Sequence, residues 1–384
     1  MVRVTSLLLA IVKKRIIVSV SNDLATDQRV RKQCEELWNA GYDIVLLGRL
    51  LPNSPDFDRP YKTLRVKLPF SKGALFYASL NIFLFFKILF SRVDILWAND
   101  LDTLPANWLV SLIKGKPLVY DSHEYFTEVP EIQHKPKVKS VWRYFEKKCI
   151  GRADIVITVS QSIANLLKET YHLDEVLTVR NVPMGSTVFP KSSKAEMGFD
   201  ENRFLLLLQG GGINMNRGGE ELVEAMRYIE NADLVIIGGG DALPELKRLA
   251  KEFELNDKIR FLAKKPYEDM MRYTSVADLG FSLDKSGNLN YLFSLPNKIF
   301  DYAMAGLPMV TSDLPEVAAF VRKNEIGIVL AEVSPKEISS QVNKLIGDPS
   351  RLDELRKNVS RMHSELSWEK EFAPVLNRLK TDFV

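Results

Sequence analysis

The sequence predicts an α/β protein with two Rossmann-like, doubly wound domains that face each other across a cleft. Three observations favour this fold class. The 384 residues suffice for two domains, short apolar strand segments alternate with helical segments in two successive series, and a stretch rich in Pro, Ser, Gly and charge separates the series. We therefore expect an N-terminal domain over 1–183, a linker over 184–202, a C-terminal domain over 203–365 and a C-terminal helix over 366–384 that crosses between the domains.

The first series starts with an apolar run at 15–20, of the kind that a parallel sheet buries on both faces. The apolar residues 4–12 lack a cleavage site and precede three basic residues, so we interpret them as an extension of this strand or as an ill-defined start. A polar turn then leads to a helix over 27–40, which Gly41 closes. The other segments are expected as strands at 42–48, 63–69, 93–100, 117–124, 153–160 and 175–182, with helices at 72–90, 101–113 and 161–170 and a basic helical stretch before 153.

The second series repeats this alternation without a detectable sequence repeat. Strands are expected at 203–209, 232–240, 258–263, 277–283, 308–312 and 327–330, and helices near 219–229, 243–253, 267–274 and 291–306. Ligands of open parallel sheets bind outside the carboxyl ends of the strands, so a site is expected in the cleft.

Composition and cysteine usage limit the classes of partner, compartment and cofactor that the sequence favours. The net charge of +3 is too small to indicate a nucleic acid partner. Cys34 and Cys149 have neither metal-ligand spacing nor the pattern of a disulfide framework, which favours a reducing, cytoplasmic setting. No cluster of His, Cys or Asp has metal spacing, so we expect no metal and no other cofactor.

The segment 291–306 predicts an anion site. We expect Ser294 to cap the helix, Pro296 to lie in its first turn, and Gly306 to end it. Lys298 and Asp301, three residues apart, then share one face near the positive end of the helix dipole. This pair suits a nucleotide diphosphate, with Lys298 on phosphate and Asp301 on ribose hydroxyls. The alternative is a capped surface helix with one ion pair.

Two glycine runs follow strands of the second series. Gly210, Gly211 and Gly212 precede a helix together with Arg217, where glycines let the backbone approach a phosphate and a guanidinium offers a forked donor. The second run, which contains Gly239, can line the same cleft or form a tight turn. Neither run has the dinucleotide spacing, which argues against a nicotinamide dehydrogenase.

Several motifs resemble one known family. QGGGINMNRGGEELVEAM, VIIGGG, IRFLA and PNKIFDYAMAGLPMV resemble the C-terminal domain of family 4 glycosyltransferases, and SNDLATDQRVRKQ, ANDLDTL, YDSHE, ADIVITVSQSIA and VRNVP resemble their N-terminal domain in the same order. These enzymes are retaining, depend on a nucleotide sugar and have the GT-B fold. The resemblance covers nearly the whole chain.

The resemblance implies roles for individual residues. Arg217 and Lys298 correspond to the basic residues on the donor diphosphate, and Asp301 to the second carboxylate of a Glu-x7-Glu motif that holds ribose. Phe293 stands where the first carboxylate is expected, and this departure hands the sugar contact to backbone N–H groups of 292–295. The donor site implied in this way contains Gly211, Gly212, Arg217, Gly239, Leu295, Asn297, Lys298 and Asp301, and the catalytic residues are His123, Arg217 and Lys298.

The acceptor side is expected in the first domain. By the resemblance, His123 touches the donor sugar near its anomeric carbon, where we expect a neutral imidazole to accept a sugar hydroxyl. Asp100-Leu101-Asp102 is formally a D-x-D, the metal signature of another glycosyltransferase fold, but it precedes a helix that Asp102 can cap, so we discount a metal role. The acceptor-side residues are Asp27, Arg29, Asp100, Asp102 and Glu124.

The segment 74–90 is apolar around too much of its circumference for an ordinary surface helix and is too short for a confident membrane span. It is either a core helix or an interfacial element beside a basic series between 135 and 152. The second interpretation adds an anionic membrane surface as a partner, at the cytoplasmic leaflet, and suits a lipid-linked acceptor.

The sequence therefore predicts a glycosyltransferase that moves a sugar from a nucleotide-diphosphate sugar to a hydroxyl of a glycan or lipid-linked acceptor, with retention of configuration. Two alternatives stay open. One is a nucleotide-sugar epimerase of the same two-domain plan, and the other is a non-catalytic nucleotide-sugar-binding protein, made credible by Phe293.

Overall fold

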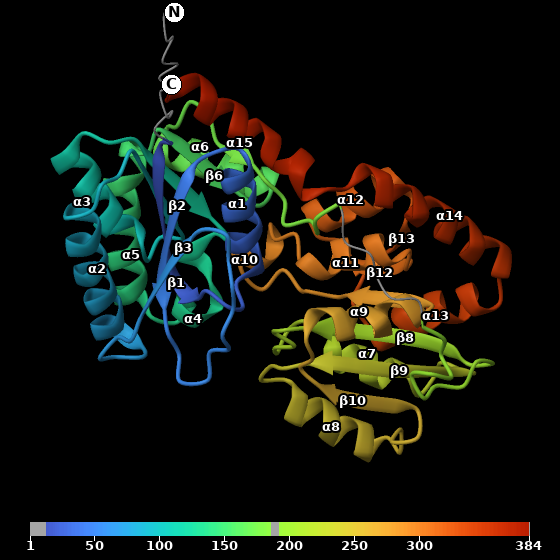
Figure 1. Ribbon diagram of the computed structural model, residues 1–384. Helices are drawn as coiled ribbons and strands as arrows, with labels where there is room; N and C mark the ends of the chain where they lie inside the picture. The colour runs from blue at the N-terminus through green and yellow to red at the C-terminus, as the bar shows by residue number, and fades with distance from the viewer. Residues whose placement is uncertain (1–12, 186–191, 384) are drawn as a thin grey trace, which may run out of the picture.

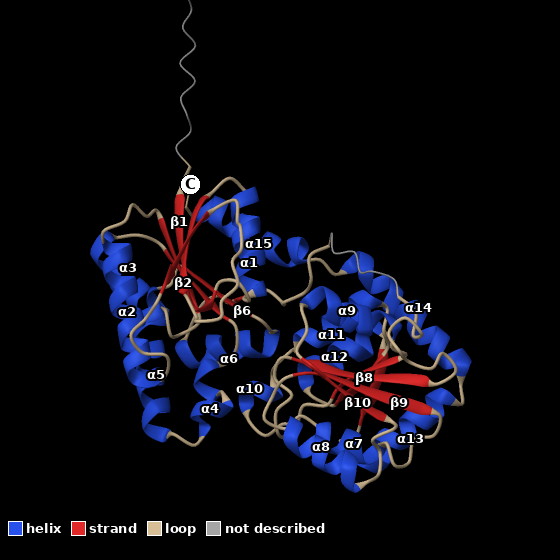
Figure 2. Ribbon diagram, turned by 60° about the horizontal axis from the view of Figure 1, so that its bottom comes forward, coloured by secondary structure: helices blue, strands red, loops and turns tan. Residues whose placement is uncertain are grey.

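The computed structural model describes residues 13–185 and 192–383, and they form two parallel β-sheets covered by helices (Figures 1 and 2). The N-terminal sheet has seven strands in the order β3-β2-β1-β4-β5-β6-β7, and the C-terminal sheet has six in the order β10-β9-β8-β11-β12-β13. Each order reverses direction once, between β1 and β4 and between β8 and β11, as in doubly wound folds. The predicted fold class is confirmed; the expectations for residues 1–12 lie outside the described residues.

The central strands of the N-terminal sheet, among them β1, β4 and β5, are buried on both faces, as is typical of parallel sheets. Helices α2, α3 and α5 lie on one face of this sheet, and α1 lies on the other (Figure 1). Its elements are β1 (Arg15–Asp23), α1 (Gln28–Asn39), β2 (Asp43–Arg49), β3 (Lys62–Val66), α2 (Gly73–Leu89), β4 (Ile95–Asn99), α3 (Leu104–Lys114), β5 (Leu118–Ser122), α4 (Pro130–Gln133), α5 (Pro136–Cys149), β6 (Ile155–Thr158), α6 (Gln161–Tyr171) and β7 (Leu177–Thr178).

The C-terminal sheet follows the same plan. Helices α7, α8 and α13 cover one face, and α9, α11, α12 and α14 cover the other. The elements are β8 (Phe204–Gly210), α7 (Gly219–Ala225), β9 (Ala232–Gly238), α8 (Leu243–Glu252), β10 (Ile259–Ala263), α9 (Tyr267–Val276), β11 (Leu279–Ser282), α10 (Leu289–Leu292), α11 (Asn297–Ala305), β12 (Met309–Ser312), α12 (Pro315–Asn324), β13 (Gly327–Leu330), α13 (Pro335–Ile346), α14 (Pro349–Glu365) and α15 (Trp368–Asp382).

The segment 291–306 differs from its prediction because it contains the end of one helix and the whole of another. Asn288 caps α10 through its side chain, and Pro296 occupies the N-cap position of α11. Ser294 caps neither helix, since its hydroxyl donates to the carbonyl oxygen of Tyr291 at 3.0 Å. Gly306 ends α11 in the left-handed conformation at φ 74°, as its position predicts.

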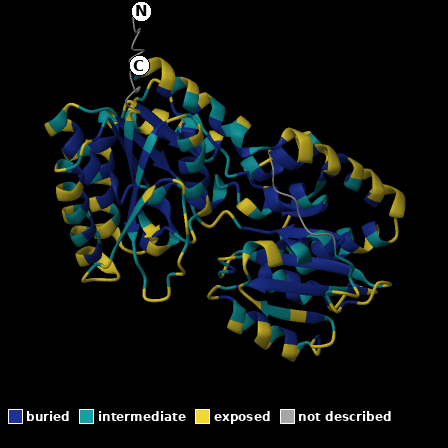
Figure 3. Ribbon diagram, in the orientation of Figure 1, coloured by how far each residue is buried: buried dark blue, intermediate teal, exposed yellow. Residues whose placement is uncertain are grey.

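The last helix, α15, returns from the C-terminal domain to the N-terminal domain, as its dark red ribbon in Figure 1 shows. Its Trp368 and Phe372 stack at 5.4 Å, and Phe372 reaches Trp97 of β4 at 6.1 Å between ring centroids. The Glu371 carboxylate pairs with Arg180 just after β7. One continuous hydrophobic core therefore joins α1 and α15 to α11, α12 and α14, and Figure 3 shows the buried strands at the centre of both domains.

Helix α2 is a core helix on one side only. Phe76, Leu80, Leu84 and Ile88 recur at every fourth residue and are buried against the sheet. The opposite side of α2 is also apolar but faces solvent. Among the described residues, no helix combines the length and the apolar character that a membrane span requires.

Candidate active site

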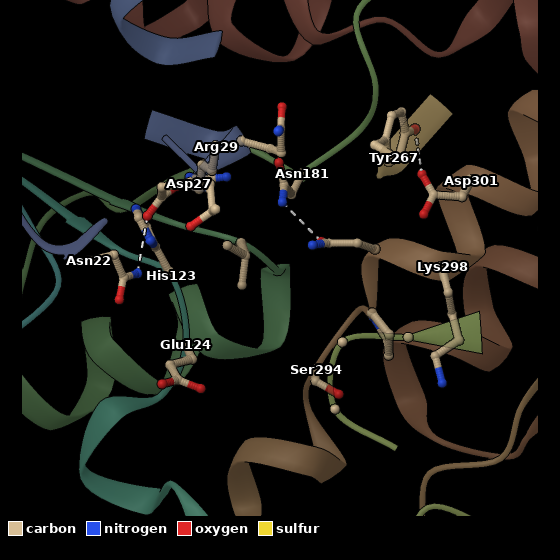
Figure 4. A pocket seen from close by; sticks show the side chains of 18 of the residues that line it. Asn22, Asp27, Arg29, His123, Glu124, Asn181, Tyr267, Ser294, Lys298 and Asp301 are labelled. Atoms are coloured by element: carbon tan, nitrogen blue, oxygen red, sulfur yellow. Dashed lines mark hydrogen bonds between the residues drawn. The ribbon is translucent and has the colours of Figure 1, made fainter. Parts of the chain in front are cut away.

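A cleft of about 820 Å³ lies where the carboxyl ends of the strands of the two sheets face each other. Figure 4 shows its two sides: Asn22, Asp27, Arg29, His123 and Glu124 come from the N-terminal domain, and Tyr267, Ser294, Lys298 and Asp301 come from the C-terminal domain. This is the location that the predicted topology implies. The volume is that of a typical site for a small ligand or cofactor.

Two cations on the C-terminal side face a buried carboxylate. The Arg217 Nε lies 3.4 Å from Oδ1 of Asp284, and the guanidinium lies over the Tyr291 ring at 4.5 Å. Burial lowers the pKa of Lys298, and nearby Arg217 adds to this effect while Asp284 opposes it. Asp284 is only 2% exposed, and neither carboxylate oxygen has a hydrogen-bond partner among the described residues. Together Arg217 and Lys298 make an anion site that Asp284 orients.

The N-terminus of α11 points into the same part of the cleft. Leu295 and Asn297 both line it, as predicted. The Asn297 side chain accepts a hydrogen bond from Asn181 of the N-terminal domain at 3.0 Å, which links the two sides (Figure 4). Ile299 N donates to the Pro296 carbonyl at 3.1 Å, but the N–H groups of Asn297 and Lys298 come before the first hydrogen bond of the helix and are available to an anion.

Asp301 lies one turn further along α11 and lines the cleft. The Tyr267 hydroxyl donates to its Oδ1 at 2.8 Å. Burial raises the pKa of Asp301 to about 6, although the Tyr267 hydrogen bond and nearby Lys32 act in the opposite direction. Lys298 and Asp301 therefore flank one cleft, as their spacing predicts, and they are not a surface ion pair.

The two glycine runs have different places. Gly211 and Gly212 line the cleft next to Arg217. Gly239 does not line the cleft. Its carbonyl accepts a hydrogen bond from Ile213 N at 2.7 Å and so supports the loop that contains the first glycine run. A Cβ on Gly238 would lie 1.8 Å from the Gly210 carbonyl oxygen, so the second run is a tight turn that allows two backbones to approach.

His123 lies at the end of β5 between two carboxylates. Its Nδ1 is 3.2 Å from Asp100, and its Nε2 is 3.2 Å from Asn99 Oδ1 and 3.5 Å from Asp121. Burial disfavours the charged ring, but Asp100 and Asp121 outweigh it and raise the pKa of His123 well above 6.5. The surroundings therefore favour the protonated ring over the expected neutral imidazole, because both ring nitrogens face acceptors.

Arg29 forms a buried ion pair with Asp121, the carboxylate that also lies next to His123. Its guanidinium donates to both oxygens of Asp121, at 2.8 and 3.2 Å, and to the Val179 carbonyl at 2.8 Å. Burial alone would raise the pKa of Asp121, but Arg29 and His123 hold it well below its usual range. Asp27 accepts from Val30 N at 3.0 Å and caps α1. Both predicted acceptor-side residues line the cleft, but their polar atoms are largely used within the protein.

Of the two predicted acceptor-side carboxylates Asp102 and Glu124, only Glu124 reaches the cleft. Asp102 is 5% exposed, is not part of the cleft wall and does not cap α3, whose N-cap is Thr103. The expected acceptor and capping roles of Asp102 are therefore corrected, and burial with nearby Asp100 raises its pKa to about 7. Glu124 does line the cleft, and its carboxylate accepts from Asn290 at 3.2 Å. Burial, with Asp100, also raises the pKa of Glu124 to about 7.

Phe293 belongs to the interface between the domains and not to the cleft. Its ring packs against the core of the N-terminal domain, and its carbonyl accepts from the Ser160 hydroxyl at 2.8 Å. The N–H groups of Leu292, Phe293 and Ser294 donate to carbonyls at 2.9, 3.1 and 3.3 Å within or just after α10. The expectation that backbone N–H groups of 292–295 hold a sugar is therefore wrong for these three residues.

The sequence analysis did not select several charged and polar residues of the site: Lys32 and Tyr267 line the cleft, and Asp284 and Asp121 lie behind it against Arg217 and Arg29. Asp284 and Asp121 follow or end strands of the two sheets, so a search for polar residues at carboxyl ends of strands would have found both. Lys32 and Tyr267 carry no such signal, because they reach the cleft from helices.

In the described parts of the chain, no group of three His, Cys, Asp or Glu residues has the geometry of a metal site, and both cysteines are free and buried.

Comparison with protein families gives two matches that together cover most of the chain. Residues 192–362 match the model of glycosyl transferases group 1, and residues 27–181 match the model of glycosyltransferase family 4. The boundary between the matches falls in the Pro- and Ser-rich stretch of the sequence. The predicted domain boundaries themselves stay predictions.

Individual proteins are similar at low sequence identity. The chitobiosyldiphosphodolichol beta-mannosyltransferase of Candida albicans is 24% identical over 265 residues, which cover 62% of this chain and 56% of that enzyme. The sucrose-phosphate synthase structure from Thermosynechococcus elongatus has a TM-score of 0.79 at 18% identity, covering 96% of this chain and 99% of its own. The Anabaena HepE structure with UDP and glucose has a TM-score of 0.74 at 15% identity, covering 96% and 100%.

Proposed function

This chain belongs to the group 1 glycosyltransferases of the GT-B fold, and we propose that it moves a sugar from a nucleotide-diphosphate sugar to an acceptor hydroxyl with retention of configuration. One observation carries the proposal. Arg217, Lys298 and the N-terminus of α11 converge on one end of the cleft, and Asp301 lies one helical turn away. This arrangement fits a diphosphate followed by a ribose.

The leaving diphosphate is the centre of the proposed mechanism. Arg217, Lys298 and the free N–H groups of α11 stabilise the negative charge that develops on it, in the role that a metal ion has at other sites. The phosphate oxygen accepts the proton of the incoming hydroxyl on the same face of the sugar, so no protein nucleophile is required. The nucleoside diphosphate leaves with this proton, and the new glycosidic bond replaces the broken sugar–phosphate bond.

The N-terminal side of the cleft positions sugar and acceptor. The His123 Nε2 has only long contacts, at 3.2 and 3.5 Å, so a sugar hydroxyl competes well for its N–H. Glu124 is the accessible carboxylate of this side and accepts a hydrogen bond from another hydroxyl of the acceptor. Asp121 orients the His123 ring from 3.5 Å away, and Arg29 fixes Asp121 through its ion pair.

The relatives support the donor and acceptor classes in this proposal. One is named for mannosyl transfer to a lipid-linked chitobiosyl diphosphate, and the Anabaena structure holds UDP and glucose. We therefore propose a nucleotide-sugar donor, a glycan or lipid-linked acceptor and action at the cytoplasmic face of a membrane. We propose no nucleic acid partner and no metal.

A thermal-shift screen against UDP, GDP, ADP and their sugars tests the donor site. We expect one nucleotide diphosphate to stabilise the wild type with or without EDTA, and the stabilisation to fall in Lys298→Ala and Asp301→Ala. Lys344→Ala, an exposed lysine on α13, is the matched control. Failure of every nucleotide, or an equal response of all variants, contradicts the site.

Product analysis tests the reaction itself. With the stabilising nucleotide sugar as donor, NMR of the product should show the anomeric configuration of the donor. Inversion contradicts the proposed mechanism. Conversion of the donor to its epimer without an acceptor identifies an epimerase, and donor binding without turnover identifies a non-catalytic protein.

A further inference from the structure

We propose that an apolar groove on the outer face of the N-terminal domain binds the hydrocarbon chain of a lipid-linked acceptor. The groove lies between α2 and α3 on one side and α4 and α5 on the other, and its volume is about 960 Å³. These helices lie together on the same side of the molecule in Figures 1 and 2. This inference rests on the proposed glycosyl transfer and names the class of acceptor.

Aromatic side chains form the floor of the groove. The Tyr77 and Trp142 rings meet edge to face with centroids 4.9 Å apart, and Phe126 meets Trp142 at 5.2 Å. The walls are aliphatic or aromatic and open to solvent: Ile82 is 60% exposed, and Val141, on the opposite wall, is 54% exposed. A groove that leaves this much apolar surface in water gains free energy when an apolar ligand covers it.

The groove offers little to a ligand that needs hydrogen bonds along its length. Asn81 is a polar residue in the wall, and its side chain already donates to the carbonyls of Tyr77 and Asp102 and accepts from Ala106 N. A peptide in the groove would leave backbone groups without partners. A saturated or isoprenoid chain has no such groups, so a hydrocarbon chain is the occupant that fits.

The inner end of the groove opens into the catalytic cleft. Glu124, Arg217, Asn290 and Tyr291 line both cavities. A ligand that fills the groove therefore has its polar end beside Glu124 and the phosphate-binding Arg217. This continuity is what an acceptor with a hydroxyl-bearing head and a long chain requires.

The outer end of the groove carries positive charge. Lys135 and Glu131 both line it, and Lys137 lies two residues beyond Lys135 at an exposed position. Lys139 and Arg143 share the carboxylate of Glu128, so these three groups together add one positive charge. Exposed lysines around an apolar opening fit the anionic surface of a bilayer from which the chain would enter.

Binding of n-hexyl, n-octyl and n-decyl β-D-glucoside, each below its micelle concentration, tests the groove by calorimetry without a donor. We expect the dissociation constant to fall with each added methylene, by up to about fourfold. Ile82→Asp and Val141→Asp place a charge in opposite walls and should remove this dependence on chain length. Ile113→Asp on α3, equally exposed at 60% and outside the groove, should keep it.

Three outcomes overturn the proposal. They are a dissociation constant that changes less than twofold from hexyl to decyl, an equal effect of all three variants, or self-association that Ile82→Asp abolishes and decyl glucoside does not. The last result would identify a second copy of the chain as the occupant. Nucleotide thermal shifts on the same variants distinguish the two proposals. If affinity depends on chain length but no nucleotide binds, the glycosyl transfer is refuted and the groove is still supported. If a nucleotide binds but affinity does not depend on chain length, only the groove is refuted.

Discussion

Replacing Asp301 by Asn should make the protein more stable and its nucleotide binding weaker. The carboxylate is 8% exposed, and the Tyr267 hydroxyl donates to it at 2.8 Å. An Asn oxygen can accept the same hydrogen bond in a side chain of nearly the same shape. The substitution therefore removes the charge and leaves the packing.

The pKa gives the magnitude of the stability change. The folded protein has a pKa of about 6 at Asp301, against the usual 3.8, because burial disfavours the ionised form. Above pH 6 the folded state carries the full cost of this charge, which is about 3 kcal/mol at about 1.4 kcal/mol per pH unit. As the pH falls through 6 the folded protein takes up a proton before the unfolded chain does, so its stability rises until about pH 4.

At pH 8 the free energy of unfolding of the Asn variant should therefore exceed that of the wild type by up to about 3 kcal/mol. The loss of the Asp301 charge next to Lys32 reduces this gain. At pH 4 the two proteins should differ little. The affinity of the Asn variant for the nucleotide diphosphate should fall by about tenfold to a hundredfold, since hydrogen bonds from ribose hydroxyls to a carboxylate contribute about 1.5–3 kcal/mol.

Urea denaturation at pH 8 and pH 4, with calorimetric titration of the nucleotide, measures both effects. Tyr267→Phe is the matched control, because it removes the hydrogen bond, raises the pKa of Asp301 further and should lower stability at pH 8. An Asn variant that is less stable than the wild type at pH 8, or that binds nucleotide equally well, would refute the reasoning.

Three further substitutions test neighbouring parts of the site. Arg29→Met leaves the Asp121 carboxylate buried with only His123 and Gln33 beside it, and should cost about 3 kcal/mol in urea denaturation; no loss would show that the ion pair is not stabilising. Lys298→Met should weaken nucleotide diphosphate binding about tenfold to a hundredfold, and because burial lowers the Lys298 pKa in the empty site, wild-type binding should take up protons at alkaline pH; calorimetry in buffers of different ionisation enthalpy checks this, and proton release would contradict it. We expect kcat/KM of the wild type to rise around pH 7, because the pKa of Glu124 is about 7, and Glu124→Gln should flatten this rise; an unchanged pH profile would exclude that carboxylate from acceptor binding.

The order of elements, and the position of Arg217, Lys298 and Asp301 along one cleft, could be predicted from the sequence because both depend on local patterns. Alternating apolar strands and helices determine the two sheets, and a spacing of three residues determines that Lys298 and Asp301 share a face. The glycine run before Arg217 follows a strand, so its position at the cleft follows from topology.

Properties that depend on several elements at once could not be predicted. The raised pKa of His123 results from Asp100 and Asp121, which follow or belong to different strands, and the pKa of Asp301 depends on Tyr267 at the start of another helix. The break between α10 and α11 was missed because Ser294 and Pro296 allow a cap in several registers. Phe293 departs from the family motif because it has a second environment, the core of the other domain, which no local pattern reveals.

The return of α15 to the N-terminal domain means that the chain passes between the domains twice, and the two crossings lie side by side, since Trp368 N donates to the Pro183 carbonyl at 3.0 Å. Two connections that are hydrogen-bonded to each other act as a single hinge. Opening and closing of the cleft is then a rotation about this one place. Any change at Trp368, where the second crossing is anchored, should alter how far the cleft opens before it alters what the cleft binds.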